Sequence, residues 1–299
     1  MGNSFKPWLL MGILSILLVV MGKLIGGQGG MMVFLLIAVL MNFAGYWFSD
    51  RIAIKMTGSQ PLAEQDAPEL YAMVRRLCRQ AGLPMPKLYI TPSLQPNAFA
   101  TGRDPHHASI AVTQGLLQAL SQEELEGVLA HELAHIKNRD ILIGSLAAMV
   151  AGAITMIANT AQWALMFGFG RREDEGEGGS PLGLLGSLLM IIVAPLAATL
   201  IQMAISRSRE FYADEAGAGM AGNSRGLAQA LLKLERASAM MPMDVNPAAA
   251  HMFIVNPLAG ESLLHLFSTH PPISERVSRL RRMKFDEPQE GSSSEVHGL

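Results

Sequence analysis

The chain has 299 residues, of which half are hydrophobic and only 16% are charged, with a net charge of −2. The charged fraction lies below the usual quarter of soluble globular proteins, and the balanced charge excludes the basic footprint of a nucleic-acid-binding protein. The single cysteine excludes an internal disulfide, which fits a reducing compartment.

Four apolar blocks suggest a membrane-embedded protein with about four transmembrane helices in a bilayer. The last three are long enough to cross a hydrocarbon core, which needs about 20 helical residues. The first is shorter, and a signal peptide is its rival interpretation. An uncleaved anchor is favoured because no clear cleavage site follows and a second apolar block comes at once. The blocks are residues 7–22, 31–49, 141–170 and 182–206.

These blocks divide the chain into five parts, which alternate between membrane and polar segments. We predict a transmembrane hairpin (1–50), a polar part (51–140), a second transmembrane hairpin (141–206), a second polar part (207–285) and a disordered tail (286–299). Of the 23 Lys and Arg residues, nine lie in 51–140 and ten in 206–299. If all four blocks span, both polar parts face one side, which the positive-inside rule assigns to the cytoplasm.

Local patterns in the polar parts predict mainly helices with a small β-sheet. Apolar residues at helical spacing cover 67–82 and end at Gly82, a plausible C-cap, and short strands are expected at 87–90, 97–101 and 109–113. A capping box of Ser121 and Glu124 opens the next helix. Further helices are expected at 207–222, 224–238 and 272–283.

The helix after Ser121 contains His131, Glu132 and His135, in the pattern H-E-x-x-H. Two histidines four residues apart on a helix place both imidazoles on one face, a geometry that suits zinc. Zinc lowers the pKa of a bound water to about 7, and Glu132 can take its proton as it attacks a carbonyl, then pass the proton to the leaving amine. The alternative is a chance match on a charged helix.

A catalytic zinc needs a third protein ligand, for which the other histidines and the carboxylates are candidates. If the third and fourth apolar blocks form a hairpin, the chain returns to the same side near Ser206. Glu210 and Asp214 follow within a few residues and share a helix face. Glu210 is therefore the favoured third ligand, and Asp214 is placed to hydrogen-bond the second nitrogen of a histidine. The alternative for this pair is an exposed acidic face.

The combination of "HELAH" (131–135) with "SREFYADEAG" (208–217) resembles the M48 membrane zinc metalloproteases, specifically the HtpX type. The segments "PNAFATG" (96–102) and "THPPISERVSRL" (269–280) resemble the same type, so the likeness covers almost the whole chain. It implies a membrane-embedded zincin-like fold and a zinc endopeptidase of the bacterial inner membrane. The implied task is proteolytic quality control of misfolded or damaged membrane proteins under stress.

The resemblance also implies roles for individual residues. His131, His135 and Glu210 match the family's zinc ligands, Glu132 its catalytic glutamate, and Asp214 its outer acid. The stretch Asn97, Ala98, Phe99 and Ala100 matches a segment that borders the cleft and pairs with substrate backbone, as an extended peptide adds to a sheet edge. His270 matches a histidine near the active site that could steady an oxyanion, and a turn histidine before two prolines is its alternative.

Other functions are compatible with parts of this pattern. A CAAX-type prenyl-peptide endoprotease has a similar zinc site, but more membrane helices than four. A non-enzymatic membrane chaperone or scaffold would not require the complete ligand set. A structural zinc site is disfavoured because such sites are usually closed by four protein ligands including Cys. Manganese or cobalt could replace zinc in vitro, and the sequence does not determine the oligomeric state.

Overall fold

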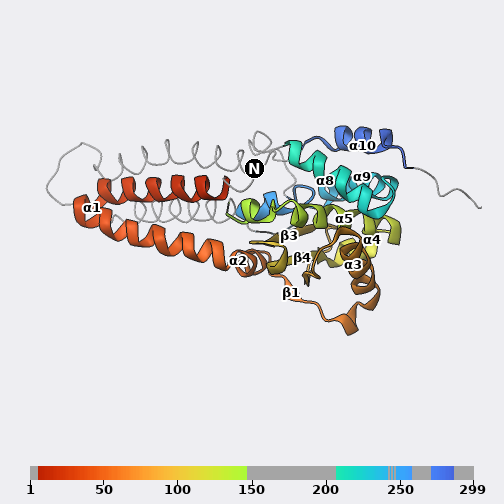
Figure 1. The fold of residues 1–299 in the computed structure, drawn as a ribbon, viewed down its shortest axis with the longest axis horizontal. Helices are drawn as coiled ribbons and strands as arrows, with labels where there is room; N and C mark the ends of the chain where they lie inside the picture. Colours follow the sequence, from red (N-terminus) through yellow and green to blue (C-terminus); the bar gives the residue numbers. More distant parts are fainter. Residues whose placement is uncertain are drawn as a thin grey trace, which may run out of the picture.

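The computed structural model describes residues 6–146, 207–241, 243, 245, 247–257 and 271–285. Within these ranges the protein is mainly helical with one small sheet, as predicted, and it is elongated (Figure 1). Most of the expected hairpin 141–206, the tail 286–299 and His270 lie outside the described residues.

The N-terminal element, α1 (Lys6–Trp47), is two helical arms joined at Gly26 and Gly27, where the backbone leaves helical geometry. The arms run side by side at one end of the molecule (Figure 1). Asn42 Nδ2 on the second arm donates to the Met11 carbonyl at 3.3 Å and to Ser15 Oγ at 2.7 Å on the first. These bonds join the two arms through the Asn42 amide nitrogen inside an otherwise apolar pair of helices.

The second arm, Gly26–Trp47, is long and apolar enough to cross a membrane, and it is the single such helix among the described residues. The first arm contains a shorter apolar stretch, Pro7–Val20. Large apolar side chains on α1 face outward, including Leu36 and Val39, which are 60% and 58% exposed. A contiguous surface of this kind is typical of contact with lipid or protein. Four spans remain a prediction.

A four-stranded sheet follows the hairpin and has the order β1-β2-β4-β3. Strand β1 (Gln60–Pro61) pairs antiparallel with β2 (Lys87–Thr91), β2 pairs parallel with β4 (Ala108–Thr113), and β3 (Ala98–Gly102) pairs antiparallel with β4. The three strands expected from the sequence are confirmed to within one residue at each end. Strand β3 lies at the edge of the sheet, next to the helix that carries the histidines (Figure 1).

The histidine-bearing helix, α5 (Gln122–Lys137), is the centre of the folded body. Its N-terminus has the predicted capping box, because Ser121 Oγ accepts from the Glu124 N–H while the Glu124 carboxylate accepts from the Ser121 N–H. Helices α8 (Arg207–Ala221), α9 (Arg225–Met240) and α3 (Pro68–Ala81) pack around it. The last of these ends at Gly82 in left-handed geometry, as expected of a C-cap.

The remaining elements are short and connect or cover these layers. Helix α2 (Ser49–Met56) joins the hairpin to the sheet, and α10 (Ile273–Arg282) packs on α8 and α9. The others are α4 (Gln114–Ala119) and the 3₁₀ turns η1 (Glu64–Asp66), η2 (Pro105–His107) and η3 (Pro247–Met252). Residues 141–146 begin another helix after α5.

Candidate metal centre

Two helices meet at the site because a glycine lets their backbones approach closely. A Cβ atom on Gly217 of α8 would lie 2.8 Å from the His131 backbone nitrogen and 2.9 Å from its Cα, too close for any side chain. Glu210 and Asp214 lie seven and three residues before Gly217, on the same face of α8. The contact at Gly217 therefore brings both carboxylates against the histidines of α5.

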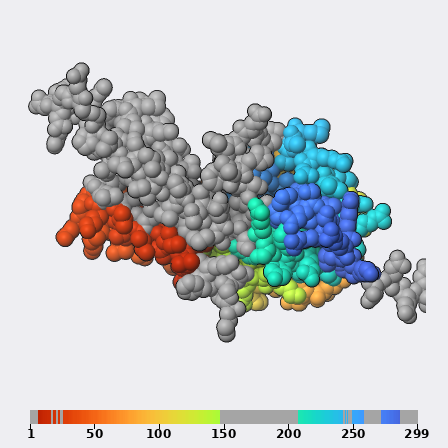
Figure 2. All heavy atoms as spheres, turned by 90° about the horizontal axis from the view of Figure 1, so that it is seen from above, coloured from red at the N-terminus to blue at the C-terminus, as the bar shows by residue number. Residues whose placement is uncertain are grey.

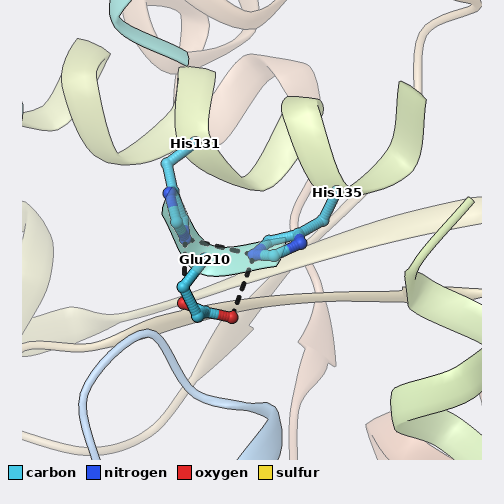
Figure 3. A group of neighbouring side chains, drawn as sticks. All are labelled: His131, His135 and Glu210. Atoms are coloured by element: carbon cyan, nitrogen blue, oxygen red, sulfur yellow. Dashed lines mark hydrogen bonds and ion pairs between the residues drawn. The ribbon is translucent and has the colours of Figure 1, made fainter. Parts of the chain in front are cut away.

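The nitrogen and oxygen donors of His131, His135 and Glu210 all lie within 4.8 Å of one another (Figure 3). The two Nε2 atoms are 3.2 Å apart, and the Glu210 oxygens lie 3.8 Å from His131 Nε2 and 3.6 Å from His135 Nε2. Ligands at about 2.0–2.2 Å around a tetrahedral zinc are separated by roughly 3.4 Å from each other. The three donors are therefore spaced as a tetrahedral metal requires.

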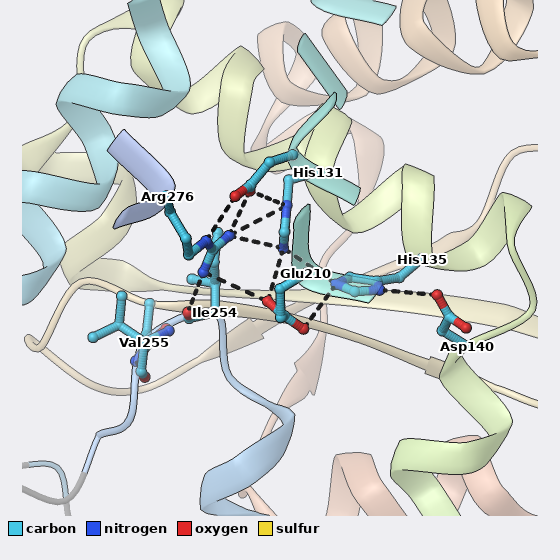
Figure 4. A network of polar contacts seen from close by, with 9 residues as sticks. His131, His135, Asp140, Glu210, Ile254, Val255 and Arg276 are labelled. Carbon is cyan, nitrogen blue, oxygen red and sulfur yellow. Dashed lines mark hydrogen bonds and ion pairs between the residues drawn. The ribbon is translucent and has the colours of Figure 1, made fainter. Parts of the chain in front are cut away.

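Asp214 and Arg276 form a second layer behind His131. Asp214 Oδ1 lies 3.0 Å from His131 Nδ1, which leaves Nε2 directed at the donor cluster. The fully buried Arg276 donates two hydrogen bonds to the same carboxylate, from Nε to Oδ2 at 2.9 Å and from Nη2 to Oδ1 at 2.6 Å. Its Nη1 also donates to the Ile254 carbonyl at 3.3 Å and lies 3.5 Å from Glu210 Oε2 (Figure 4).

Asp140 occupies the equivalent place behind His135. Its Oδ2 lies 3.5 Å from His135 Nδ1 (Figure 4), and its Oδ1 lies 3.7 Å from Arg209 Nη1. The chain reverses just before it, at Arg139, which has a left-handed φ of 58°. That turn returns the Asp140 carboxylate toward the last turn of α5, so each histidine has one carboxylate on its outer nitrogen.

The charge balance of the centre also favours a divalent cation. Four buried carboxylates lie here, on Glu132, Asp140, Glu210 and Asp214, against the two buried guanidiniums of Arg209 and Arg276. With all four carboxylates ionised and both histidines neutral, the described groups therefore sum to −2. Uncompensated charge is costly in a protein interior, and one divalent ion would neutralise the cluster.

Burial and the neighbouring carboxylates shift the pKa values of the two histidines in opposite directions. Burial lowers the pKa of His131 to about 4, opposed by its bond to Asp214. Burial also acts to lower the pKa of His135, but Asp140, Glu210 and Glu132 outweigh it and raise this pKa to about 9. Metal binding requires both imidazoles in their neutral form.

Glu132 follows His131 on α5, and its carboxylate interacts electrostatically with His135 and Glu210. Within the described part of the chain, its Oε1 is buried and has no hydrogen-bond partner. Burial raises the pKa of Glu132 to about 7, while the backbone of Ala100 on β3 hydrogen-bonds the carboxylate and acts in the opposite direction. A buried, unpartnered carboxylate oxygen is expected where water and substrate enter.

The expected substrate segment, 97–100, lies beside the site, but much of it is occupied by the protein itself. The Asn97 side chain donates from Nδ2 to the Val255 carbonyl at 2.7 Å and accepts from the Val255 N–H at 3.4 Å. The Ala98 carbonyl accepts from the Ile254 N–H at 3.0 Å. Phe99 pairs with Ala111 of β4 and packs its ring on Phe253. Ala100 is the position of the four whose backbone hydrogen-bonds Glu132.

Sequence reasoning did not assign Arg276 or Asp140. Arg276 shares a face of α10 with Ile273, Val277 and Leu280, all buried, so the available signal was a charged residue within an apolar stripe. Asp140 gave a weaker signal, because its distance from His135 depends on the left-handed turn at Arg139. The structure brings together His131, Glu132, His135, Glu210 and Asp214, the five predicted residues that it describes outside the sheet edge.

Comparison with known proteins agrees with this geometry. The model of peptidase family M48 matches residues 64–284. A protease HtpX homolog from Pelotomaculum thermopropionicum is 63% identical over 281 residues, 94% of this chain and 99% of that protein. One from Pyrococcus furiosus is 52% identical over 286 residues, 95% of this chain and 97% of that protein.

A solved structure extends the likeness to the fold. The crystal structure of S. mikatae Ste24p matches 93% of this chain and 65% of its own, with a TM-score of 0.50 and 21% identity. At that identity the match concerns the fold alone. Together with the apolar helix of α1, the family match and the close HtpX relatives decide the class of the protein. The chain belongs to peptidase family M48 and is a membrane metalloprotease.

Proposed function

We propose that this protein is a zinc endopeptidase of the bacterial inner membrane that cleaves misfolded or damaged membrane proteins on the cytoplasmic side. The observation that carries the proposal is the donor cluster of His131, His135 and Glu210 beside the Glu132 carboxylate, whose Oε1 has no hydrogen-bond partner among the described residues. The two-nitrogen, one-oxygen donor set suits zinc, and it leaves a fourth position open for chemistry.

Each residue of the metal centre has a separate role in peptide hydrolysis. Zinc bound by the three donors would act as a Lewis acid that polarises the scissile carbonyl and activates water. Glu132 accepts the proton of the attacking water and returns it to the leaving amine. Asp214 and Asp140 hold the outer nitrogens of His131 and His135, which keeps Nε2 of each ring directed at the metal position.

The edge of β3 is the proposed place for the substrate backbone. Ile254 and Val255 cover the edge at Asn97 and Ala98, so an extended peptide would add beyond them, from Ala100 onward. The backbone of Ala100 also hydrogen-bonds Glu132. A peptide bound there would therefore place its scissile bond near the Glu132 carboxylate. His270, outside the described residues, remains a proposed donor to the oxyanion of the transition state.

The proposal is tested by replacing Glu132 with Gln in the full-length protein in detergent. Cleavage of an unfolded membrane protein should fall by at least about 100-fold, the usual contribution of a positioned acid–base group. The metal content should stay at that of the wild type. Glu123→Gln, an exposed position on the same helix, is the matched control and should keep full activity. Undiminished cleavage by the Glu132 variant would exclude the proposed mechanism.

The metal and the topology need separate measurements. Metal analysis of freshly purified protein, followed by chelation and readdition of zinc, manganese or cobalt, identifies the ion that restores cleavage. Reporter fusions in the 171–180 segment test the four spans, because a cytoplasmic signal there would contradict them. The HtpX relatives favour this endopeptidase over the prenyl-peptide alternative, which cleavage confined to a farnesylated peptide would instead support.

A further inference from the structure

A cavity of about 350 Å³ lies where the N-terminal hairpin meets the sheet, far from the metal centre in sequence. Its size falls within the range of small-ligand sites, about 300–1,000 Å³. The lining combines three aromatic side chains, Phe43, Trp47 and Phe48, with three basic ones, Arg51, Lys87 and Arg103, and is completed by Asp50 and His107.

The topology of the sheet explains why basic residues gather here. Strand β2 begins at Lys87, β4 begins after His107, and the antiparallel β3 ends just before Arg103, so these residues lie at one end of the sheet. Arg103 ties this end to the hairpin, because its Nη1 donates to the Trp47 carbonyl at 3.3 Å and its guanidinium lies 4.7 Å from the Trp47 ring centre.

Two of the basic groups have no acidic partner within the described part of the chain. Neither Arg51 nor Lys87 forms an ion pair with any residue that the structure describes, and the Arg51 guanidinium lies 5.6 Å from the centre of the Phe48 ring. Arg103 and His107 are partly compensated by Asp104, at 3.5 and 2.9 Å. Asp50 offsets one further charge, so the cavity keeps a positive excess that resides mainly on Arg51 and Lys87.

The cavity also lies at the end of the helix that is long and apolar enough to cross a membrane. Trp47 is the last residue of the apolar helix Gly26–Trp47, and Phe43 on the turn before it is 56% exposed. Aromatic side chains at the end of a span mark the headgroup region, where basic residues meet lipid phosphates. In a bilayer spanned by this helix, the aromatic side chains would lie at the depth of the glycerol and upper acyl chains. The basic side chains would lie at the depth of the phosphates.

We propose that this cavity binds the phosphate of an anionic phospholipid headgroup, held by Arg51 and Lys87, with the rest of the lipid against Phe43 and Trp47. A soluble anion would use the basic residues but not the aromatic ones. An acidic peptide would not require a position at the end of the span. The inference concerns lipid binding and is independent of the metal chemistry proposed above.

Trp47 supplies a direct probe of this site. In a Trp8→Phe, Trp163→Phe background, Trp47 is the single tryptophan of the full-length protein. Vesicles of phosphatidylcholine would contain a minor fraction of brominated phosphatidylglycerol or, in parallel, of brominated phosphatidylcholine. Quenching of Trp47 fluorescence then reports which headgroup occupies the cavity. We expect brominated phosphatidylglycerol to quench at roughly 30-fold lower mole fraction, given the contribution of two basic residues near an anionic lipid.

The variant Arg51→Gln, Lys87→Gln should abolish this preference. The control Arg281→Gln, Arg282→Gln removes the same charge from exposed positions on α10, which lies away from the N-terminal hairpin (Figure 2), and should retain it. The swap Arg51→Lys, Lys87→Arg keeps both charges and should also retain it, which separates loss of charge from loss of fold.

Three results would overturn the proposal. Equal quenching by the two brominated lipids would show that the cavity does not select an anionic headgroup. A preference that survives in the Arg51→Gln, Lys87→Gln variant would place the lipid elsewhere. Loss of the preference on addition of millimolar inorganic phosphate, at constant ionic strength, would assign the cavity to a soluble anion.

Discussion

The buried pair of Arg276 and Asp214 makes the sharpest prediction for stability. Arg276 is fully buried and Asp214 is 3% exposed, and two short hydrogen bonds join them. Arg276→Met keeps much of the volume but leaves the Asp214 carboxylate buried without its cation. Breaking a buried pair in this way costs about 3–5 kcal/mol. At about 2–4 °C for each kcal/mol, the melting temperature should fall by roughly 6–20 °C.

The assay is thermal unfolding of the metal-loaded full-length protein in detergent, at one fixed scan rate because such unfolding is often irreversible. Arg281→Gln is the matched control, since it removes a charge from an exposed position of the same helix, and it should change the melting temperature little. Arg276→Met combined with Asp214→Leu should recover part of the loss, because both charges leave together.

Two outcomes would refute this reasoning. A melting temperature of Arg276→Met equal to that of the control would show that Asp214 does not depend on its cation. A double variant less stable than Arg276→Met alone would show that the carboxylate, even unpaired, is better than an apolar side chain. The second case would point to the bond between Asp214 and His131 as the dominant interaction.

Three further predictions concern the metal ligands, the helix contact and the thiol. Asp140→Asn should weaken metal binding about 10–100-fold in chelator competition, because Asp140 orients His135, and an unchanged affinity would contradict this role. Gly217→Ala should destabilise the protein by about 1–3 kcal/mol through overpacking against His131. The control Gly219→Ala, with open space around its Cβ, should be neutral or stabilising. Equal unfolding temperatures of the two variants would exclude the close contact at Gly217. Cys78 is buried and burial raises the pKa of its thiol to about 11, so at pH 8 roughly one molecule in a thousand carries the reactive thiolate. Alkylation at pH 8 should therefore be slow in the folded protein and fast in denaturant, and rapid labelling of the native protein would contradict its burial.

The sheet edge shows where a pattern in sequence was informative but incomplete. The stretch 97–100 was expected beside the cleft, and the structure places its last residue against Glu132. The sequence could not reveal that Asn97 and Ala98 are bonded to Val255 and Ile254, more than 150 residues later in the chain. Pairing over such a distance depends on how the fold returns, which no local pattern encodes.

Local chemistry made the central features of this protein accessible from sequence alone. Helical spacing placed His131 and His135 on one face, capping preferences located the start of α5, and strand patterns found β2, β3 and β4. These properties depend on residues within one or two turns of each other. The tertiary structure decided which carboxylates meet the histidines, because Glu210 and Asp214 reach them only through the close packing of α8 on α5 at Gly217. It also decided that Arg276 is buried behind Asp214 and that Lys87 and Arg103 lie together where the hairpin meets the sheet, because long-range packing sets the neighbours of a charged residue.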